Sequence, residues 1–469
     1  MTTTPPSPQG HPQRWLILGV ICLAQLTVLL DNTILNVAIP SLTRELGAET
    51  SDIQWMINAY SLVQSGLLLT AGSAADRYGR KKLLAAGLAL FGVGSVVAGL
   101  ATTSAQLIAA RAGMGVGGAL LLTTTLAVAM QIFTPEEQPR AIGIWAAVNA
   151  LGFATGPLIG GVMLNHFWWG AVFLINLPVA ALGLVAVIAL VPESKNPQGD
   201  RPDLLGAFLS TIGMASLVFA IISGPTHGWT SARVLVSGAV AAVVLALFAR
   251  WESRIPYPML DLGFFRNRRF TGAVGGAVLI TFGMGGALFL LTQHLQFVLG
   301  YGPLEAGLRT APLALTVVLL NFTGVAARVT AKLGAPPVVL TSMVLMSGGL
   351  VSIATSGEGY AGTAAGLVLI GVGCAFANPA MAHAIMSSIP PAKAGVGAGI
   401  NGTLAEFGNG LGVAVLGAVL GSSLAAGKSL SDGLGAGQLV GAVAVLLGGL
   451  VAAALLRRAE KEEQPVLVA

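Results

Sequence analysis

The chain has 469 residues, of which 55% are hydrophobic and only 9% are charged. In ordinary soluble proteins about 25% of the residues are charged. A soluble protein with so few charges could not cover its surface with polar groups, so we expect lipid to surround most of this chain. The net charge of +5 does not predict nucleic-acid binding, because the basic residues lie in short gaps between apolar runs.

The two cysteines, Cys22 and Cys374, both lie inside apolar runs and predict neither a disulfide framework nor a metal site. No cofactor is expected, and ATP is not implied because the sequence has no phosphate-binding GxxxxGKS or GxxxxGKT segment. The first apolar run follows Arg14 without a cleavage site and predicts a spanning helix rather than a signal peptide. Residues 1–14, rich in Pro and Thr, are expected to form a disordered cytoplasmic tail.

A membrane-spanning helix needs about 20 mostly apolar residues. Fourteen segments of the sequence meet this requirement. They are 15–39, 53–74, 83–101, 105–132, 140–164, 168–191, 204–223, 233–250, 270–298, 303–327, 336–354, 361–386, 394–421 and 437–456. The sequence therefore predicts an all-α, polytopic membrane protein with fourteen spans.

The distribution of Lys and Arg tests this count, because basic residues gather in cytoplasmic loops. With a cytoplasmic N-terminus, nineteen of them fall in predicted cytoplasmic loops and tails. Only Arg44, Arg233 and Lys428 fall in predicted loops on the outer side of the membrane, and Arg111 and Arg309 lie within predicted spans. This asymmetry predicts that both termini are cytoplasmic, as in a multi-pass protein of a bacterial cytoplasmic membrane.

An internal repeat is visible in two places. The segment from Gly324 to Gly334 is similar to the one from Gly72 to Arg80, and the sequence around Gly371 is similar to that around Gly115. Parallel repeats of this kind build transporters from two halves, with the substrate site between them. We therefore predict six-helix bundles at 15–191 and 270–456, a linker with two inserted helices at 192–269, and a cytoplasmic tail at 457–469.

Four motifs carry a resemblance to a known family. The segment Gly72–Lys82 reads GSAADRYGRKK and resembles motif A of the major facilitator superfamily. Residues 30–40 resemble the helix-1 motif, residues 152–161 resemble antiporter motif C, and residues 296–308 resemble the segment between helices 9 and 10 in its fourteen-helix drug:proton antiporters. The resemblance implies exporters of quaternary-ammonium compounds or antibiotics.

In motif A, Gly72 and Gly79 are expected to permit a tight turn and close helix approach. Asp76 is expected either to cap a helix or to pair with an arginine between the two halves. The basic residues partly follow the positive-inside rule, but this rule does not explain Asp76 or the glycine spacing. We therefore predict that Asp76, Arg77 and Arg80 form a gate.

In motif C, Gly152, Gly156 and Gly160 fall on one helix face, which predicts close packing of two helix backbones. Pro157 frees a backbone carbonyl and predicts a kink, and Gly161 completes the motif. The alternative is a packing face with no role in transport. The outward direction of transport is implied only by the resemblance.

Three ionisable residues lie deep in predicted spans, where charge is costly and usually marks a pathway or a buried pair. Asp31 either contributes to coupling and cation binding, as the resemblance implies, or bonds to neighbouring backbone. Arg111 matches the arginine of motif B, which the family links to proton transfer, or else forms a fixed ion pair between helices 1 and 4. Glu406 stands alone in an uncharged span and is the predicted proton carrier.

Uncharged polar groups in the spans are candidates for a substrate cavity, although each could equally join helices. They are Asn36, Asn58, Tyr60, Gln64, Asn149, Asn321, Asn378, His383 and Asn409. His383 either relays protons or forms a hydrogen bond between helices. In the family that the sequence resembles, exporters of divalent cations have an acidic residue in helix 10; the run 310–327 has none, so the resemblance argues against divalent cations as substrates.

These features predict a proton-coupled antiporter that exports amphiphilic drugs or antibiotics, acts as a monomer in lipid and binds no nucleic acid. One alternative is an exporter dedicated to one metabolite or self-made antibiotic. A membrane-embedded lipid-modifying enzyme is the alternative from another class, but the loops contain no catalytic cluster.

Overall fold

The computed structural model describes residues 11–463 except 135, 197–200, 358 and 390–393. All regular elements of these residues are helices. The first half comprises α1 (Arg14–Leu46), α2 (Thr50–Tyr78), α3 (Arg80–Gly99), α4 (Ser104–Ile132), α5 (Gln138–His166), α6 (Ala171–Leu174) and α7 (Asn176–Leu190). Then come α8 (Leu204–His227), α9 (Ala232–Glu252) and the 3-10 helix η1 (Leu262–Arg266). The second half comprises α10 (Arg268–Gln293), the π-helix η2 (His294–Val298), α11 (Pro303–Arg309), α12 (Ala311–Phe322), α13 (Val325–Leu333), α14 (Ala335–Ala354), α15 (Tyr360–Ser387), α16 (Ala394–Ala425) and α17 (Leu430–Glu463).

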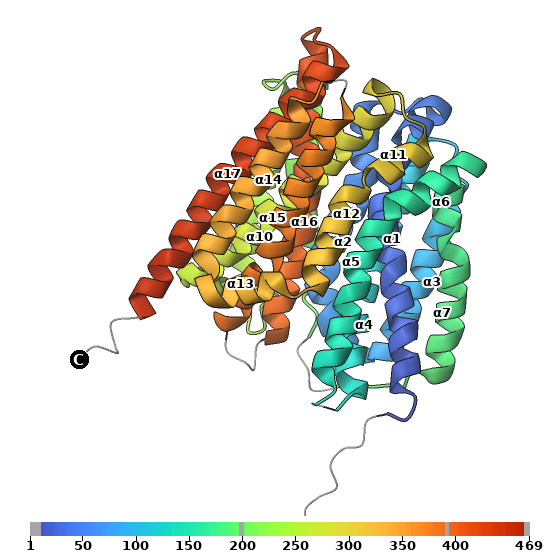
Figure 1. Ribbon diagram of the computed structural model, residues 1–469. Helices are drawn as coiled ribbons and strands as arrows, with labels where there is room; N and C mark the ends of the chain where they lie inside the picture. The colour runs from blue at the N-terminus through green and yellow to red at the C-terminus, as the bar shows by residue number, and fades with distance from the viewer. Residues whose placement is uncertain (1–10, 135, 197–200, 358, 390–393, 464–469) are drawn as a thin grey trace, which may run out of the picture.

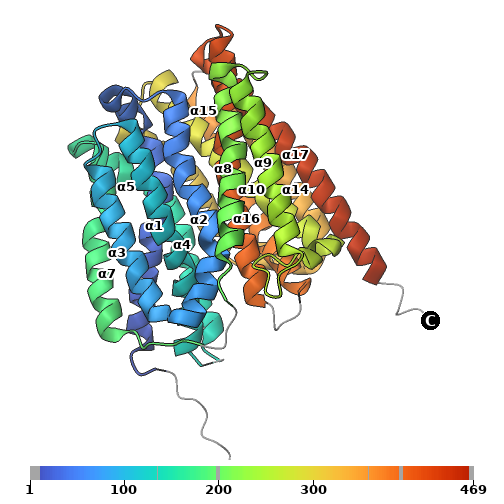
Figure 2. The same ribbon diagram turned by 180° about the vertical axis from the view of Figure 1, so that it is seen from behind.

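Two bundles lie side by side (Figure 1). Helices α1 to α7 pack mainly on one another, and so do α10 to α17. The inserted pair, α8 and α9, packs on the back, where α8 contacts both α2 and α16 (Figure 2). This grouping follows the predicted division of the chain, whose boundaries stay a prediction.

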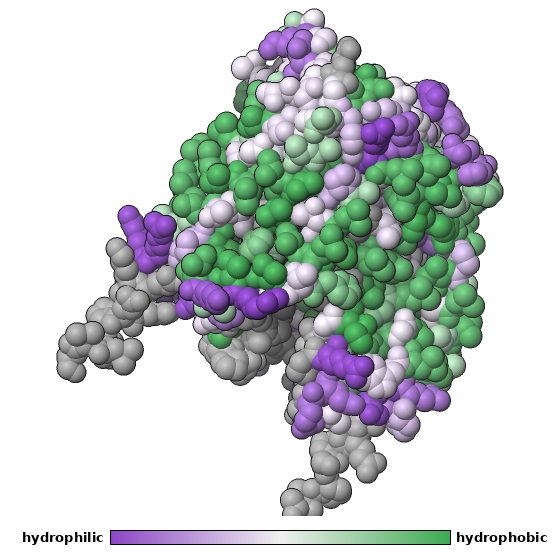
Figure 3. Space-filling model, in the orientation of Figure 1, coloured by the Kyte–Doolittle hydropathy of each residue, from purple (hydrophilic) through white to green (hydrophobic). Residues whose placement is uncertain are grey.

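Apolar side chains cover the middle of the molecule, and polar ones gather at its two ends (Figure 3). Hydrocarbon supplies no hydrogen bonds, so long helices that satisfy their own backbone suit this surface. Helix α1 begins and helix α17 ends at the same end of the molecule, which is here called the terminal end (Figure 1). The opposite end is called the distal end. The protein is therefore a multi-pass membrane protein.

Twelve helices among the described residues are long and apolar enough to cross a membrane. The two other predicted spans correspond to α2 and α5, which are 29 residues long. Many polar residues lower the mean hydropathy of α2, and those in its middle, from Gln54 to Thr70, are buried. The all-helical class is confirmed, whereas the count of fourteen spans stays a prediction.

The structure corrects three predicted boundaries. The span at 303–327 divides at Thr310 into α11 and α12 and ends at Phe322, because Pro312 begins a new helix and Gly324 takes the left-handed φ of 62°. The span at 168–191 divides into α6 and α7. The predicted tail at 457–469 is helical as far as Glu463, since α17 continues beyond its apolar part.

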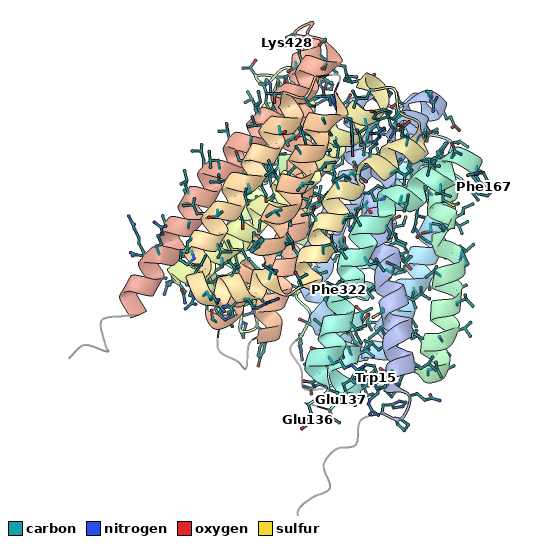
Figure 4. All side chains as sticks on the ribbon, viewed as in Figure 1. Trp15, Glu136, Glu137, Phe167, Phe322 and Lys428 are labelled. Carbon is teal, nitrogen blue, oxygen red and sulfur yellow. The ribbon has the colours of Figure 1, made fainter. Side chains whose placement is uncertain are left out.

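An ion pair and two ring contacts hold the terminal end of the first bundle together (Figure 4). Arg14 Nε lies 2.7 Å from Glu137 Oε2, which joins the start of α1 to the start of α5. The ring of Trp15 lies 4.8 Å from that of Phe133 and 4.9 Å from the guanidinium of Arg140. These contacts fix the start of α1 against the end of α4 and the start of α5.

The motif C glycines bring α5 close to α1. A β-carbon on Gly152 would lie 2.8 Å from Leu29 Cβ, and one on Gly160 would lie 2.7 Å from Ile34 Cγ1, both on α1. Gly156 likewise leaves room only for Thr33 of α1. The predicted close packing on one face is therefore confirmed.

The other face of α5 meets the second bundle. A β-carbon on Gly161 would lie 2.6 Å from the carbonyl oxygen of Pro303, and the carbonyl of Pro157 occupies the space beside Gly307 of α11. Because these neighbours are backbone atoms, they cannot turn aside. Motif C thus joins α1 on one face and α11 on the other, and α5 continues as one helix through Pro157.

We predict that Gly161→Ala lowers the melting temperature of the purified protein in detergent, because overpacking against fixed backbone costs about 1–3 kcal/mol. Gly143→Ala is the matched control, since no atom lies within 4 Å of a β-carbon at this position of the same helix. Thermal unfolding of the two variants should differ clearly. Equal melting temperatures would show that α5 and α11 adjust without cost.

Candidate functional site

The two charged residues deepest in the first bundle form an ion pair. Asp31 of α1 and Arg111 of α4 are 0% and 1% exposed, and the Arg111 guanidinium contacts Asp31 Oδ2 directly. The sequence left open whether Arg111 belongs to a pathway or to a fixed pair. The structure shows the pair between helices 1 and 4, so each of the two charges has its counter-charge.

Further contacts surround this ion pair. Arg111 Nε donates to the Met56 carbonyl at 3.0 Å, and the guanidinium lies 4.3 Å from the centre of the Tyr60 ring. Asn176 Nδ2 lies 3.4 Å from Asp31 Oδ1, and the Phe173 ring lies 6.0 Å from the guanidinium. Charge, backbone and aromatic partners together offset the cost of burying both groups.

Helix α2 meets α16 of the second bundle along an antiparallel seam. Gln54 Nε2 donates to the carbonyls of Val413 and Ala414 at 3.1 and 3.0 Å. A β-carbon on Gly410 would lie 2.6 Å from Asn58 Oδ1, so this glycine lets the two helices approach. The seam brings polar side chains of both halves to one place.

Near this seam, an unusual number of buried polar atoms lack a hydrogen bond within the described part of the chain. They are Asn36 Oδ1 on α1, Asn58 Oδ1, Tyr60 Oη, Ser61 Oγ and both amide atoms of Gln64 on α2, and Asn401 Oδ1, Thr403 Oγ1 and Glu406 Oε2 on α16. Folded proteins pair almost all buried polar atoms. Atoms left unpaired on facing helices indicate a place for water or for a polar ligand.

Tyr60 connects this cluster to the ion pair. Its ring covers Arg111, and Glu406 of α16 acts on it electrostatically. Gly118 of α4 makes room for it, because a β-carbon there would lie 2.6 Å from the Tyr60 hydroxyl and 2.9 Å from Gln64 Nε2. Asp31 and Arg111 are therefore in contact with each other, and Tyr60 lies against their ion pair; no described hydrogen bond or ion pair joins Glu406 to them.

The predicted cavity residues divide into three groups. Asn36, Asn58, Tyr60 and Gln64 are buried near the seam, and Asn409 faces Gly285 of α10. No described contact joins the exposed side chains of Asn321, Asn378 and His383 to this cluster. The side chain of Asn149 lies outside the described residues.

Motif A forms a turn held by its own charges. Arg80 Nε donates to Asp76 Oδ1 at 2.9 Å, and Arg80 Nη1 donates to the Ala127 carbonyl at 3.4 Å. In this conformation Asp76 pairs with Arg80, four residues on, rather than with an arginine of the other half. Gly79 takes φ 125°, as expected for the turn. Gly72 lies inside α2, and the gating role of this motif, including Arg77, stays a prediction.

Sequence reasoning missed Ser61, Thr403 and Phe173. A signal for Ser61 was present, because Asn58, Ser61 and Gln64 recur at helical spacing and form a polar stripe on α2. Phe173 has no such signal, since it lies in an apolar run that predicts only burial in lipid or protein.

A pocket of about 360 Å³ opens at the distal end of the molecule. It lies between the two halves, with Ile39 and Ile53 on one side and Phe289 and Phe297 on the other. Its lining is mainly apolar, and Glu49 is its acidic member.

Comparison with known proteins now identifies the family, because residues 21–413 match the family model of the Major Facilitator Superfamily. The chain belongs to this superfamily. It is therefore a transporter rather than an enzyme.

Two relatives and one solved structure illustrate the similarity. The chain is 35% identical over 455 residues to the multidrug efflux pump LfrA of Mycolicibacterium smegmatis, covering 96% of this chain and 89% of that one. It is 36% identical over 402 residues to the multidrug resistance protein Stp of Mycobacterium tuberculosis, covering 85% and 74%. A crystal structure of the peptide transporter POT has a TM-score of 0.69 at 16% identity, covers 95% of each chain and shares the fold.

We predict that Asp31→Asn and Arg111→Gln each destabilise the protein by about 3–5 kcal/mol, because each leaves one buried charge without its partner. The double variant should lose much less than the sum of the two, since neither charge then remains. Chemical unfolding in detergent micelles measures the stability of the wild type, the two single variants and the double variant. Strictly additive losses would contradict the pairing.

Proposed function

We propose that this transporter is a proton-coupled antiporter that exports hydrophobic or amphiphilic drugs or antibiotics across the bacterial cytoplasmic membrane by alternating access. Both termini are then cytoplasmic, and one chain is the transporting unit. The names of the relatives support the class of substrate. The observation that carries the proposal is the cluster of unpartnered polar atoms between α2 and α16, which includes Glu406.

The buried carboxyl group of Glu406 can account for the exchange of a proton for a cationic substrate. Glu406 Oε2 is buried and has no hydrogen bond in the described residues, and no described cation forms an ion pair with this carboxyl group. An unpaired charge inside a membrane is costly, so this carboxyl group favours one of two partners, a proton or a cationic substrate. Because the two exclude each other, binding of one releases the other, which is the requirement for antiport.

Asp31 has a different role in this scheme. Its ion pair with Arg111 leaves no free carboxylate oxygen facing the seam, since Asn176 contacts the other oxygen. Asp31 and Arg111 therefore hold Tyr60 and α2 in place, and Tyr60 transmits changes in the charge of Glu406. A single free acid suits neutral or monocationic amphiphiles, and amides and hydroxyls bind their polar groups.

The alternative, an exporter dedicated to one metabolite or self-made antibiotic, uses the same site. A cluster of seven uncharged side chains with Glu406 imposes little directional selectivity, which favours a broad range of substrates. The pocket at the distal end provides an apolar surface for release. Transport assays on a panel of neutral and monocationic antibiotics distinguish the two functions by the number of compounds exported.

We predict that Glu406→Gln abolishes proton-driven efflux, because glutamine cannot load or release a proton. Fluorescent dye accumulation in cells should rise to the level produced by a proton uncoupler in the wild type. Glu305→Gln is the control, since Glu305 is exposed and pairs with Arg309. Uncoupler-sensitive efflux that survives in Glu406→Gln would remove this residue from the coupling step.

We predict opposite stability changes for two glutamines of the same helix. Gln64→Leu should raise the melting temperature, because it removes a buried amide that has the Tyr60 hydroxyl beside it but otherwise lacks a described partner, and whose burial costs about 1–3 kcal/mol, and should weaken substrate binding about fivefold or more. Gln54→Leu should lower the melting temperature, because Gln54 donates to two carbonyls of α16. Thermal shift with and without substrate measures both effects. A fall in melting temperature for Gln64→Leu would show that this amide has a structural partner.

A further inference from the structure

A second buried acid lies far from the seam, at the terminal end of the inserted helices. Glu252 is the last residue of α9 and is only 3% exposed. Asp203 lies beside it and caps the start of α8, where its Oδ1 accepts a hydrogen bond from the backbone nitrogen of Gly206 at 2.9 Å. Neither residue belongs to the motifs or to the site between the halves.

The hydrogen bonds assign different roles to the two carboxyl groups. Trp251 Nε1 donates to both oxygens of Asp203, at 3.1 and 3.0 Å, so Asp203 acts only as an acceptor, as an ionised carboxylate does. Glu252 Oε2 accepts from the backbone nitrogen of Leu260 at 3.0 Å, whereas Oε1 is buried without a partner among the described residues. The second oxygen of Glu252 is therefore the atom without a partner.

This oxygen points at Asp203. A β-carbon placed on Gly206 would lie 2.6 Å from Glu252 Oε1 and would also touch Asp203 Oδ2, so both oxygens border the same small space. The two carboxyl groups interact electrostatically and lie within hydrogen-bonding reach, and among the described residues Asp203 is the charged neighbour that acts on Glu252. On the neighbouring segments, Asp76 of α2 pairs with Arg80, and Arg77, Asp261, Arg268 and Arg269 have interactions of their own. No described ion pair joins Glu252 or Asp203 to the remaining charged residues of these segments, which are Arg201, Arg250, Arg254 and Arg266.

Glu252 is buried, Asp203 beside it is half-buried, and no cation among the described residues pairs with either, so ionisation of both is costly and the pair retains one proton on Glu252. We propose that Glu252 and Asp203 form a proton-binding site in the inserted hairpin, in which protonated Glu252 donates through Oε1 to Asp203 Oδ2. The site is separate from Glu406. It holds its proton whether or not a substrate is bound between the halves.

The position of this site links its proton to helix α2. Thr70 of α2, two residues before motif A, donates to the Asp203 carbonyl at 3.3 Å and lies 3.4 Å from the sulfur of Met259. Loss of the proton would place two negative charges side by side at the point where α8, α9 and the segment after α9 meet α2. The repulsion would loosen the hairpin from α2, so the site couples pH to the attachment of the inserted helices.

Infrared difference spectroscopy of the purified Glu406→Gln variant, in which the acid of the transport site contributes no band, tests the site directly from acidic to alkaline pH. The carbonyl band of one protonated carboxylic acid should disappear as the pH rises, and Glu252→Gln should lack that band while keeping the shape of the hydrogen-bonding group. In Asp203→Asn the band should persist but disappear at lower pH, because the neighbouring negative charge is gone. Glu305→Gln, an exposed acid in an ion pair, should leave the band unchanged.

A second measurement follows the structural consequence. The fluorescence difference between the wild type and Trp251→Phe reports Trp251 alone, and it should change with pH together with the infrared band. This change should be absent in Glu252→Gln and present in Glu406→Gln, which separates the site from the transport pathway. A band that survives when Glu252→Gln is combined with Glu406→Gln in a monodisperse protein, or a Trp251 signal that ignores pH, would overturn the proposal.

Discussion

Every polar group that hydrocarbon surrounds must find its partner inside the protein, and the rest of this structure follows from that constraint. In the first bundle the constraint is met completely at Asp31 and Arg111, which are joined to each other, to a backbone carbonyl and to an aromatic face. At the seam between the bundles it is not met, since polar atoms of three helices are buried without partners. The contrast separates a region that supports the fold from one that is prepared for a ligand.

Glycine determines where the bundles approach closely enough for this contrast to arise. On α5, glycines make room for side chains of α1 on one face and for the backbone of α11 on the other, so the contact with α11 is rigid. On α16, Gly410 brings α16 against the polar side chain of Asn58 rather than against backbone. The first kind of contact resists motion, while the second can exchange protein partners for water or substrate with little change in packing.

Much of the architecture could be predicted from the sequence, because spans, basic loops and motif glycines each have a local signature. The pair of Asp31 and Arg111 was one of two open alternatives, and only the packing of α1 on α4 decides between them. The break at Thr310 was missed although Arg309 and Pro312 flank it, since the apolar residues on its two sides together have the length of one span. Glu252 was missed for a different reason. In the sequence it follows Arg250 and precedes Arg254 like a surface acid, and it is buried only because the chain after α9 folds back over it.

The contacts of the inserted helices α8 and α9 determine how this hairpin can move relative to the two halves. Helix α8 touches both α2 and α16, the two helices of the seam, so any movement between the halves must shift α8 against one of them. Helix α9 has few buried residues and follows α8. The hydrogen bond from Thr70 to the Asp203 carbonyl fixes the base of α8 to α2, whereas Gly421 of α16 meets only the ring of Pro225 at its other end. The directional bond lies on the α2 side and a nonpolar contact on the α16 side. The hairpin should therefore move with the first bundle and slide along the second.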